Sequence, residues 1–475
     1  MKERIPMLKK FEENDSTENL IKTMVLDPID RNTELIYFLK FLASLTSDNR
    51  IIAVNGKWGS GKTFFLKQFQ LLCNYYSGLI KDKSVIENYI KKFQSEFKEM
   101  HLSFFSVLQE ECIEFVNEEY CNILYFNAWE YDNNSDPIKS LMYFLIETFK
   151  LDYQKIKVNW KELGKKAFYF LTKLEYGDDC IGGSHHFDEI ISNNDIKEIW
   201  KTLLDEIINE NCNKLYIILD DLDRCRPEYA IKMFERLRHF ADDERVVFIL
   251  AIDYEEISNM ISHFYGYKDN GTKFLEKVID QFLDLENRQF EDYERYLGDF
   301  VICQKVGEGY PAISDIVRKM TKYIFKDFNF TLRQMARYSE NINSFFAFYD
   351  DYAEPLSGGL GNTILKGIVL PYVLGLSIAN RNEYYKFIRG DGENRFIDFI
   401  SKNNDVISCI KINTDNFEII FREIYKFIVH IMNDDMRNIE SKDILHMRLY
   451  EETVTNVFRC INHLYDIEIY NEDDE

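Results

Sequence analysis

Proline, paired cysteine motifs and excess positive charge are scarce or absent in this sequence of 475 residues. With 7 prolines, little in the composition interrupts long helices. The 9 cysteines include no C-x-x-C pair, so we expect reduced, mostly buried thiols in a cytoplasmic protein. The formal net charge of −23 opposes non-specific binding to nucleic acid or to anionic membranes, so we expect neither as a direct partner.

Long apolar runs and common hydrolase motifs are missing as well. The longest apolar stretch, residues 364–379, is short for a membrane span and contains Lys366 and Pro371. We expect it to form a buried pair of helices without membrane contact. The chain has no His-Glu-x-x-His, no cysteine–histidine zinc spacing and no Gly-x-Ser-x-Gly. These absences exclude the corresponding zinc and serine-nucleophile centres.

Short apolar runs of strand length alternate with segments of helical periodicity in the first part of the chain. Such alternation predicts an α/β domain whose mostly parallel sheet is covered by helices on both faces. The four runs are residues 50–55, 122–127, 214–219 and 245–252.

The remaining segments divide the chain into an expected domain plan. We predict an N-terminal segment at 1–24, an α/β core at 25–290 with helical insertions near 78–120 and 153–195, and an α-helical C-terminal domain at 291–475 that ends in an acidic tail. Within this last domain the periodicity predicts helices over residues 291–326, 332–349, 364–380 and 417–432.

The first apolar run leads directly into a glycine-rich stretch. Residues 56–63 read Gly-Lys-Trp-Gly-Ser-Gly-Lys-Thr and fit G-x-x-x-x-G-K-[ST], with a strand expected before and a helix after. The glycines let the backbone N–H groups turn toward a phosphate, and the helix adds the positive end of its dipole. Lys62 is expected to contact the β- and γ-phosphates and the Thr63 hydroxyl to bind Mg²⁺. The motif therefore predicts a P-loop for a nucleoside triphosphate, most simply ATP.

Trp58 is the one large side chain inside this loop, and we expect it to pack the loop rather than to stack on a base. The residues assigned to nucleotide binding are Gly56, Trp58, Gly59, Ser60, Gly61, Lys62, Thr63 and Phe64, together with Asp253 and Arg333 outside the loop.

Two adjacent carboxylates follow the third apolar run. Asp220 is expected to bind the magnesium through a water, and Asp221 to act as the general base that polarises the attacking water. The residues leave open which acid performs which task, and a simple helix cap is the alternative.

Asp253, after the fourth run, either senses the γ-phosphate or caps the next helix. Arginines that could neutralise charge in the transition state are Arg224, Arg226, Arg333 and Arg337.

Taken together, these strings resemble the KAP family of P-loop NTPases. The resemblance rests on the P-loop, on Phe126-Asn-Ala-Trp-Glu-Tyr131 and on Asp220-Asp-Leu-Asp-Arg-Cys225 followed by Pro227. Further matches are Phe248-Ile-Leu-Ala-Ile-Asp253, Phe274-Leu-Glu-Lys-Val-Ile279 and Thr331-Leu-Arg333. The similar region runs from about residue 25 to residue 340, and nothing in the C-terminal third contributes to it.

The resemblance implies a fold and several roles. It implies a three-layer P-loop fold of the additional-strand type, related to AAA+ and STAND ATPases. It implies that Asp220 and Asp221 act in Mg²⁺ binding and hydrolysis, and that Arg224, part of the signature, acts in the active site or between subunits. Many members carry membrane helices where this chain has the polar segments near 78–120 and 153–195, so this chain departs from that pattern. Soluble bacterial relatives include ATPases of anti-phage defence systems.

Four functional classes follow from these observations. The first is an ATPase motor or regulator that assembles with copies of itself and with an effector protein, which would carry any damaging chemistry. The second is a nucleotide switch or scaffold with little turnover. The third is a kinase that uses the same loop, and the fourth is a nucleic-acid translocase, which the acidic composition disfavours.

Overall fold

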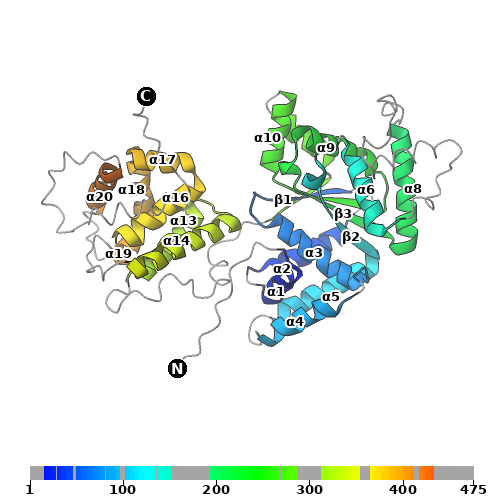
Figure 1. The fold of residues 1–475 in the computed structure, drawn as a ribbon, viewed down its shortest axis with the longest axis horizontal. Coiled ribbons are helices and arrows are strands. Elements are labelled where there is room, and N and C mark those ends of the chain that lie inside the picture. Colours follow the sequence, from blue (N-terminus) through cyan, green and yellow to red (C-terminus); the bar gives the residue numbers. More distant parts are fainter. Residues whose placement is uncertain are drawn as a thin grey trace. The chain divides into compact units, whose positions relative to one another are not determined.

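The protein is described from a computed structural model, which gives residues 15–27, 29–45, 50–80, 82–96, 102–134, 136–151, 193–266, 270–285, 312–352, 364–403, 405–409 and 417–432. By its contacts the chain divides near residue 287 into two compact units. The first unit contains a sheet between two layers of helices, and the second is helical in every element described (Figure 1). The predicted insertion near 153–195 and the helix start near 291 lie largely outside the described residues.

A five-stranded, wholly parallel sheet forms the centre of the first unit. Its order is β2-β3-β4-β1-β5, so β4 lies between β1, which leads into the P-loop, and β3, which ends at Asp220. This is the additional-strand arrangement, and the predicted α/β class is confirmed. The strands are β1 (Ile51–Asn55), β2 (Cys121–Asn127), β3 (Lys214–Asp220), β4 (Val246–Ile252) and β5 (Gln281–Asp284).

Both faces of this sheet are buried, which explains why four strands read as continuous apolar runs. Along β4, Phe248 and Leu250 enter one hydrophobic cluster while Val247 and Ile249 enter the other. One cluster is covered by α6 (Pro137–Phe149), α8 (Asn193–Asn211), α9 (Pro227–Phe240), α10 (Tyr254–Tyr265) and α11 (Asn270–Val278). The other is covered by α1 (Thr17–Leu26), α2 (Arg31–Ala43), α3 (Lys62–Ser77), α4 (Ser84–Glu96) and α5 (Leu102–Glu119) (Figure 1).

The charged segment near 78–120 contains two helices, and the predicted helical character is confirmed. Gly78, in the left-handed region at φ 83°, ends α3, and the chain then forms α4 and α5. Phe105, Leu108 and Cys112 of α5 are buried in the same cluster as the P-loop helix. The segment therefore extends one helical layer of the unit.

Strand β5 was not predicted from the sequence. It has four residues, three of them exposed, so it offers no apolar run of the kind that revealed the other strands. It is recognised by its parallel pairing with β1, in which Val54 lies opposite Leu283. Strand β2 lies at the other edge of the sheet and does have a buried apolar run, so the weak signal of β5 comes from its short, exposed sequence.

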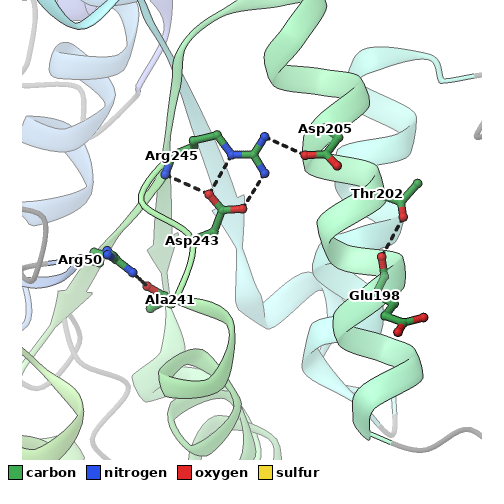
Figure 2. A network of polar contacts seen from close by, with 7 residues as sticks. All are labelled: Arg50, Glu198, Thr202, Asp205, Ala241, Asp243 and Arg245. Carbon is green, nitrogen blue, oxygen red and sulfur yellow. Dashed lines mark hydrogen bonds and ion pairs between the residues drawn. The ribbon is translucent and has the colours of Figure 1, made fainter.

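The amino ends of the strands are held by paired charges. Arg245, just before β4, binds Asp243 through two nitrogens and reaches Asp205 of α8 at 2.7 Å (Figure 2). Arg50, just before β1, donates to the carbonyl oxygen of Ala241 at 2.9 Å. These contacts join the loops at this end of the sheet to α8.

The second unit is a helical domain, as predicted. Its helices are α13 (Ala312–Asp327), α14 (Leu332–Tyr352), α16 (Leu370–Ala379), α17 (Arg381–Arg389), α18 (Glu393–Lys402), α19 (Asp405–Cys409) and α20 (Phe417–Met432). Its core is rich in aromatic rings, with Tyr372 packed against Phe387, Phe396 and Phe399.

The apolar stretch at 364–379 differs from the expected pair of helices. A π-helical turn, Leu365–Val369, runs directly into α16, so the stretch forms one continuous helix. Pro371 explains the wide turn, because its ring has no N–H and would clash with a carbonyl in the preceding α-helical turn. Among the residues that the structure describes, no helix combines the length and apolar character needed to cross a membrane.

Candidate functional site

The predicted site residues of the first unit gather at the carboxyl edge of the sheet. Because all five strands are parallel, the P-loop after β1, the acidic pair at the end of β3 and Asp253 after β4 follow the same edge. Ligands of open parallel sheets bind at this edge. The topology therefore places the sequence motifs side by side.

The backbone of the P-loop is shaped by its glycines. Gly59 and Gly61 have φ angles of 85° and 94°, in the left-handed region that side chains disfavour. A Cβ atom at Gly56 would lie 2.7 Å from the Ser60 Oγ, so a side chain here would force the Ser60 hydroxyl to move. The buried Ser60 Oγ itself has no hydrogen-bond partner among the described residues.

Lys62 is buried at the start of α3, and its Nζ donates to the carbonyl oxygens of Gly56 at 2.5 Å and Lys57 at 3.3 Å. Burial lowers the pKa of this ammonium, and the nearby carboxylates act in the opposite direction. Those carboxylates are Asp223, Asp253, Asp220 and Asp221. The Lys62 ammonium is thus buried within the loop, close enough to four carboxylates to feel their charge.

Two contacts anchor the loop from outside. Arg31, buried at the start of α2, donates from Nη2 to the carbonyl oxygen of Ser60 at 2.8 Å. The Asp253 carboxylate accepts the Trp58 backbone N–H at 3.0 Å, and its other oxygen caps α10. Of the two roles considered for Asp253, capping is the one that the structure describes, together with this hold on the loop.

Asp220 is buried at the end of β3, and both of its carboxylate oxygens accept hydrogen bonds. The Tyr125 hydroxyl donates to Oδ2 at 2.7 Å, and the backbone N–H of Asp221 donates to Oδ1 at 2.7 Å. Two donors fix the plane of the carboxylate and leave one lone pair on each oxygen for other partners.

Asp221 lies in a less favourable setting than its neighbour. Its backbone is in the left-handed region at φ 59°, which costs a residue with a side chain about 1 kcal/mol. Its carboxylate pairs with the Nε of Arg224 at 3.0 Å. Burial, with the charge of Asp220 second, raises the pKa of Asp221 to about 6, although Arg224 acts in the opposite direction. Asp220 and Asp221 thus lie in clearly different environments.

Trp58 occupies a place that the sequence did not predict. Its indole is 62% exposed, so it does not pack the loop as expected. The guanidinium of Arg224 lies 5.7 Å from the Trp58 ring centroid and 5.8 Å from that of Trp129, within the range of cation–π contacts. Trp129 belongs to the short helix η1 (Ala128–Tyr131) after β2 and is 51% exposed. Two tryptophans from different strand ends therefore contact the same arginine.

The residues present fit a triphosphate with Mg²⁺. The unpartnered Ser60 hydroxyl, the close approach at Gly56 and the N-terminus of α3 are the features that a phosphate group requires. Within the described part of the chain, no three His, Cys, Asp or Glu side chains gather into a metal cage. The residues that would hold magnesium are the two predicted from the sequence, Thr63 through its hydroxyl and Asp220 through a water.

The other predicted arginines lie apart from this constellation or in the second unit. Arg226 is tied to the loop after η1, where it donates to the Asn133 side chain at 2.6 Å and, through its backbone, to Asp132 at 3.2 Å. Arg333 and Arg337 belong to α14 of the second unit. A nucleotide-binding role for Arg333 stays a prediction. Phe64, half-buried in the first turn of α3, has no described polar contact with the loop.

Several residues of the site were missed by the sequence reasoning. Arg31 and Tyr125 follow no P-loop pattern, because their proximity depends on strand register and helix packing. Asp223 lies in the Asp220–Cys225 string that suggested the family, but the string alone gave it no role. Trp129 had a signal, since it lies in the Phe126–Tyr131 string that suggested the family. Its role could not be inferred until the structure placed it beside Arg224.

The comparison with known families now decides the relationship. The model of the KAP family P-loop domain matches residues 16–348, which is more than half of the chain. The chain belongs to the KAP family. The family match begins in front of α1 and covers the whole sheet, so the KAP domain includes the helices that carry Arg31. It also includes nearly all of α14, which begins with Leu332 and Arg333.

A curated relative gives a narrower likeness. A 66-residue segment is 33% identical to the "Phage T7 exclusion protein" of Escherichia coli (strain K12). The match spans 14% of this chain and 9% of the length of that protein. This likeness is local and concerns a small part of both chains.

Proposed function

We propose that this KAP protein binds ATP with Mg²⁺ and hydrolyses it. The observation that carries the proposal is the meeting of the P-loop lysine, Lys62, with Asp220 and Asp221 at one edge of the sheet. In this assignment Lys62, the backbone of the loop and Ser60 bind the phosphates. Thr63 and Asp220 hold the metal, which supplies positive charge to the developing oxyanions.

Asp221 acts as the general base for the attacking water. A base must reach that water and must be able to take its proton, and burial gives Asp221 a higher proton affinity than an exposed carboxylate has. Arg224, which pairs with Asp221, is the cation closest to the base and neutralises charge on the transferred phosphoryl group. The two tryptophans restrict where its guanidinium lies.

We propose further that the protein is the motor or regulatory subunit of a bacterial anti-phage defence complex. Its family and its local likeness to a phage exclusion protein support this role. It would assemble with copies of itself and with an effector protein. Size-exclusion chromatography with light scattering, with and without ATP and Mg²⁺, tests self-association. An unchanged monomer would contradict this part of the proposal.

A nucleotide switch with little turnover is the second candidate. It is favoured by the Arg224–Asp221 contact, because a carboxylate paired with a guanidinium is held away from water activation. Turnover that stays low at every protein concentration and with every partner favours the switch over the motor.

The test of hydrolysis is phosphate release by the full chain with ATP and Mg²⁺, compared with Lys62→Ala. Removing the buried ammonium should weaken triphosphate binding about 100-fold, because several charge-assisted contacts are lost together. Release should fall with it at sub-saturating ATP. Lys91→Ala on α4, where the side chain is 75% exposed, is the control and should bind ATP nearly normally. Normal binding and hydrolysis by Lys62→Ala would refute the P-loop assignment.

A further inference from the structure

Tyr125 is the residue of the site whose role the P-loop mechanism does not explain. It lies on β2, next to the acidic strand β3, with Tyr125 opposite Ile218 in the register. Its hydroxyl donates to Asp220 Oδ2 at 2.7 Å, across the two strands. A phenol in this position acts on the carboxylate that the proposed function assigns to magnesium.

The ring of Tyr125 is itself held in place. The Nζ of Lys67 on α3 lies 4.5 Å from the ring centroid, and Lys67 also pairs with Asp15 ahead of α1. The Tyr125 side chain packs against the hydrophobic cluster on the α3 face of the sheet. Its hydroxyl is therefore directed by contacts from the P-loop helix as well as by its own strand.

The geometry treats the two neighbouring acids differently. Asp220 receives one hydrogen bond on each oxygen, from Tyr125 and from the Asp221 backbone, so its carboxylate plane is fixed. Asp221 instead pairs with an arginine side chain, through the Nε of Arg224 at 3.0 Å. Mg²⁺ demands near-ideal octahedral geometry, so a pre-oriented carboxylate loses less freedom when it joins the hydrated ion.

We infer that Tyr125 is a positioning residue that orients Asp220 toward magnesium, and that it thereby assigns the metal to Asp220 and leaves Asp221 as the base. This inference rests on the proposed function and adds to it. The sequence motif contains both acids and does not distinguish them. The distinction comes from a residue on the neighbouring strand.

Tyr216 provides a matched control for Tyr125. It also lies in the sheet, on β3, and its hydroxyl also donates to a carboxylate, Glu119 Oε2, at 3.0 Å. Glu119 ends α5 near the amino end of β3, away from the P-loop edge. Replacing either tyrosine by phenylalanine removes the same type of bond and keeps the ring.

The experiment measures equilibrium binding of a fluorescent ATP analogue as Mg²⁺ is varied, for the wild-type chain, Tyr125→Phe and Tyr216→Phe. We expect Tyr125→Phe to raise the half-saturating Mg²⁺ about tenfold, in line with the loss of one hydrogen bond to a charged group. Its affinity for the analogue without Mg²⁺ should be unchanged, and Tyr216→Phe should match the wild-type chain in both values.

The possible outcomes distinguish the positioning role of Tyr125 from the proposed Mg²⁺-dependent binding of ATP. A wild-type chain without Mg²⁺-dependent binding overturns the proposed function. A wild-type chain that responds to Mg²⁺, with an unchanged half-saturation in Tyr125→Phe, overturns the positioning role alone. Equal loss in both phenylalanine variants also overturns it, because that result marks general destabilisation. As a second measurement, the effect of Tyr125→Phe should vanish in an Asp220→Asn background, and a persisting effect contradicts action through Asp220.

Discussion

The two ends of the parallel sheet hold similar charged residues in opposite arrangements. At the amino end, Arg245 is matched by Asp243 and Asp205, and Lys214 by Glu119 at 2.7 Å. At the carboxyl end, the carboxylates of Asp220, Asp221, Asp223 and Asp253 act together on Lys62. Paired charges stabilise a fold, whereas gathered carboxylates repel one another and are suited to binding a cation.

The loops at the two ends of the sheet are held by different backbone contacts. The carboxyl end contains Gly59, Gly61 and Asp221, all with positive φ, and the unpartnered hydroxyl of Ser60. At the amino end, Asp280 accepts the backbone N–H groups of both Arg50 and Ile51, at 3.0 and 2.9 Å. Tyr120, directly before β2 at the amino end, also has a positive φ of 43°, and the buried Nδ2 of Asn122 has no hydrogen-bond partner among the described residues. The two ends therefore differ in how their charges are grouped and not in the presence of left-handed backbone.

The largest expected effect is the loss of ATP hydrolysis when an acid at the carboxyl end of the sheet is replaced. Asp221→Asn should lower the rate of ATP hydrolysis about 100-fold or more, because the amide cannot take a proton from water. ATP binding should persist, and stability against urea should be equal or higher, since a buried carboxylate beside Asp220 is removed. Asparagine tolerates the left-handed backbone at this position. Wild-type turnover in this variant would exclude Asp221 as the base.

The same chemical change at the amino end should give the reverse result. Asp243→Asn should lower the free energy of unfolding by about 2 kcal/mol, because Arg245 loses a two-nitrogen contact. ATP affinity should not change. Urea denaturation measures the first quantity, and titration with a nucleotide analogue measures the second.

The loss of folding stability in Asp243→Asn should also depend on pH, and its direction can be predicted. Hydrogen bonding to Arg245 holds the pKa of Asp243 below its ordinary value of 3.8. A carboxylate whose pKa is lower in the folded than in the unfolded state stabilises the fold at any pH above its ordinary value. This stabilisation is lost as the pH falls through the pKa of the folded state. The difference between Asp243→Asn and the wild-type chain should therefore shrink below about pH 4. Asp242→Asn is the control, since that side chain is 80% exposed and should change stability little. Equal losses in both variants would contradict the pairing argument.

The smallest expected effect concerns the tryptophans around Arg224. Trp129→Ala should lower turnover at saturating ATP about two- to fivefold, which corresponds to one cation–π contact at a partly exposed site. Trp129→Phe should retain most of the rate because a ring remains. Steady-state phosphate release distinguishes the two. If alanine and phenylalanine behave alike, the ring does not position Arg224.

The sequence predicted the parts of this protein that depend on local pattern. Four strands were recognised because both faces of the sheet are buried, and the P-loop was recognised because its glycines and lysine must follow one another. Strand β5 was missed because its short, exposed sequence has no apolar run. Tyr125 and Arg31 were missed because they meet the site through strand register and helix packing, which no local spacing records. The contact between Trp58 and Arg224 could not be predicted either, because the arginine lies 166 positions later in the chain.

Strand β4 sets a distance as well as an order. Neighbouring strands lie about 4.8 Å apart, so β4 separates the axes of β1 and β3 by about 10 Å. In the proposed function, this separation would leave room for a terminal phosphate and a layer of water between the P-loop and the acids that follow β3. The inserted strand would then act as a spacer for the attacking water.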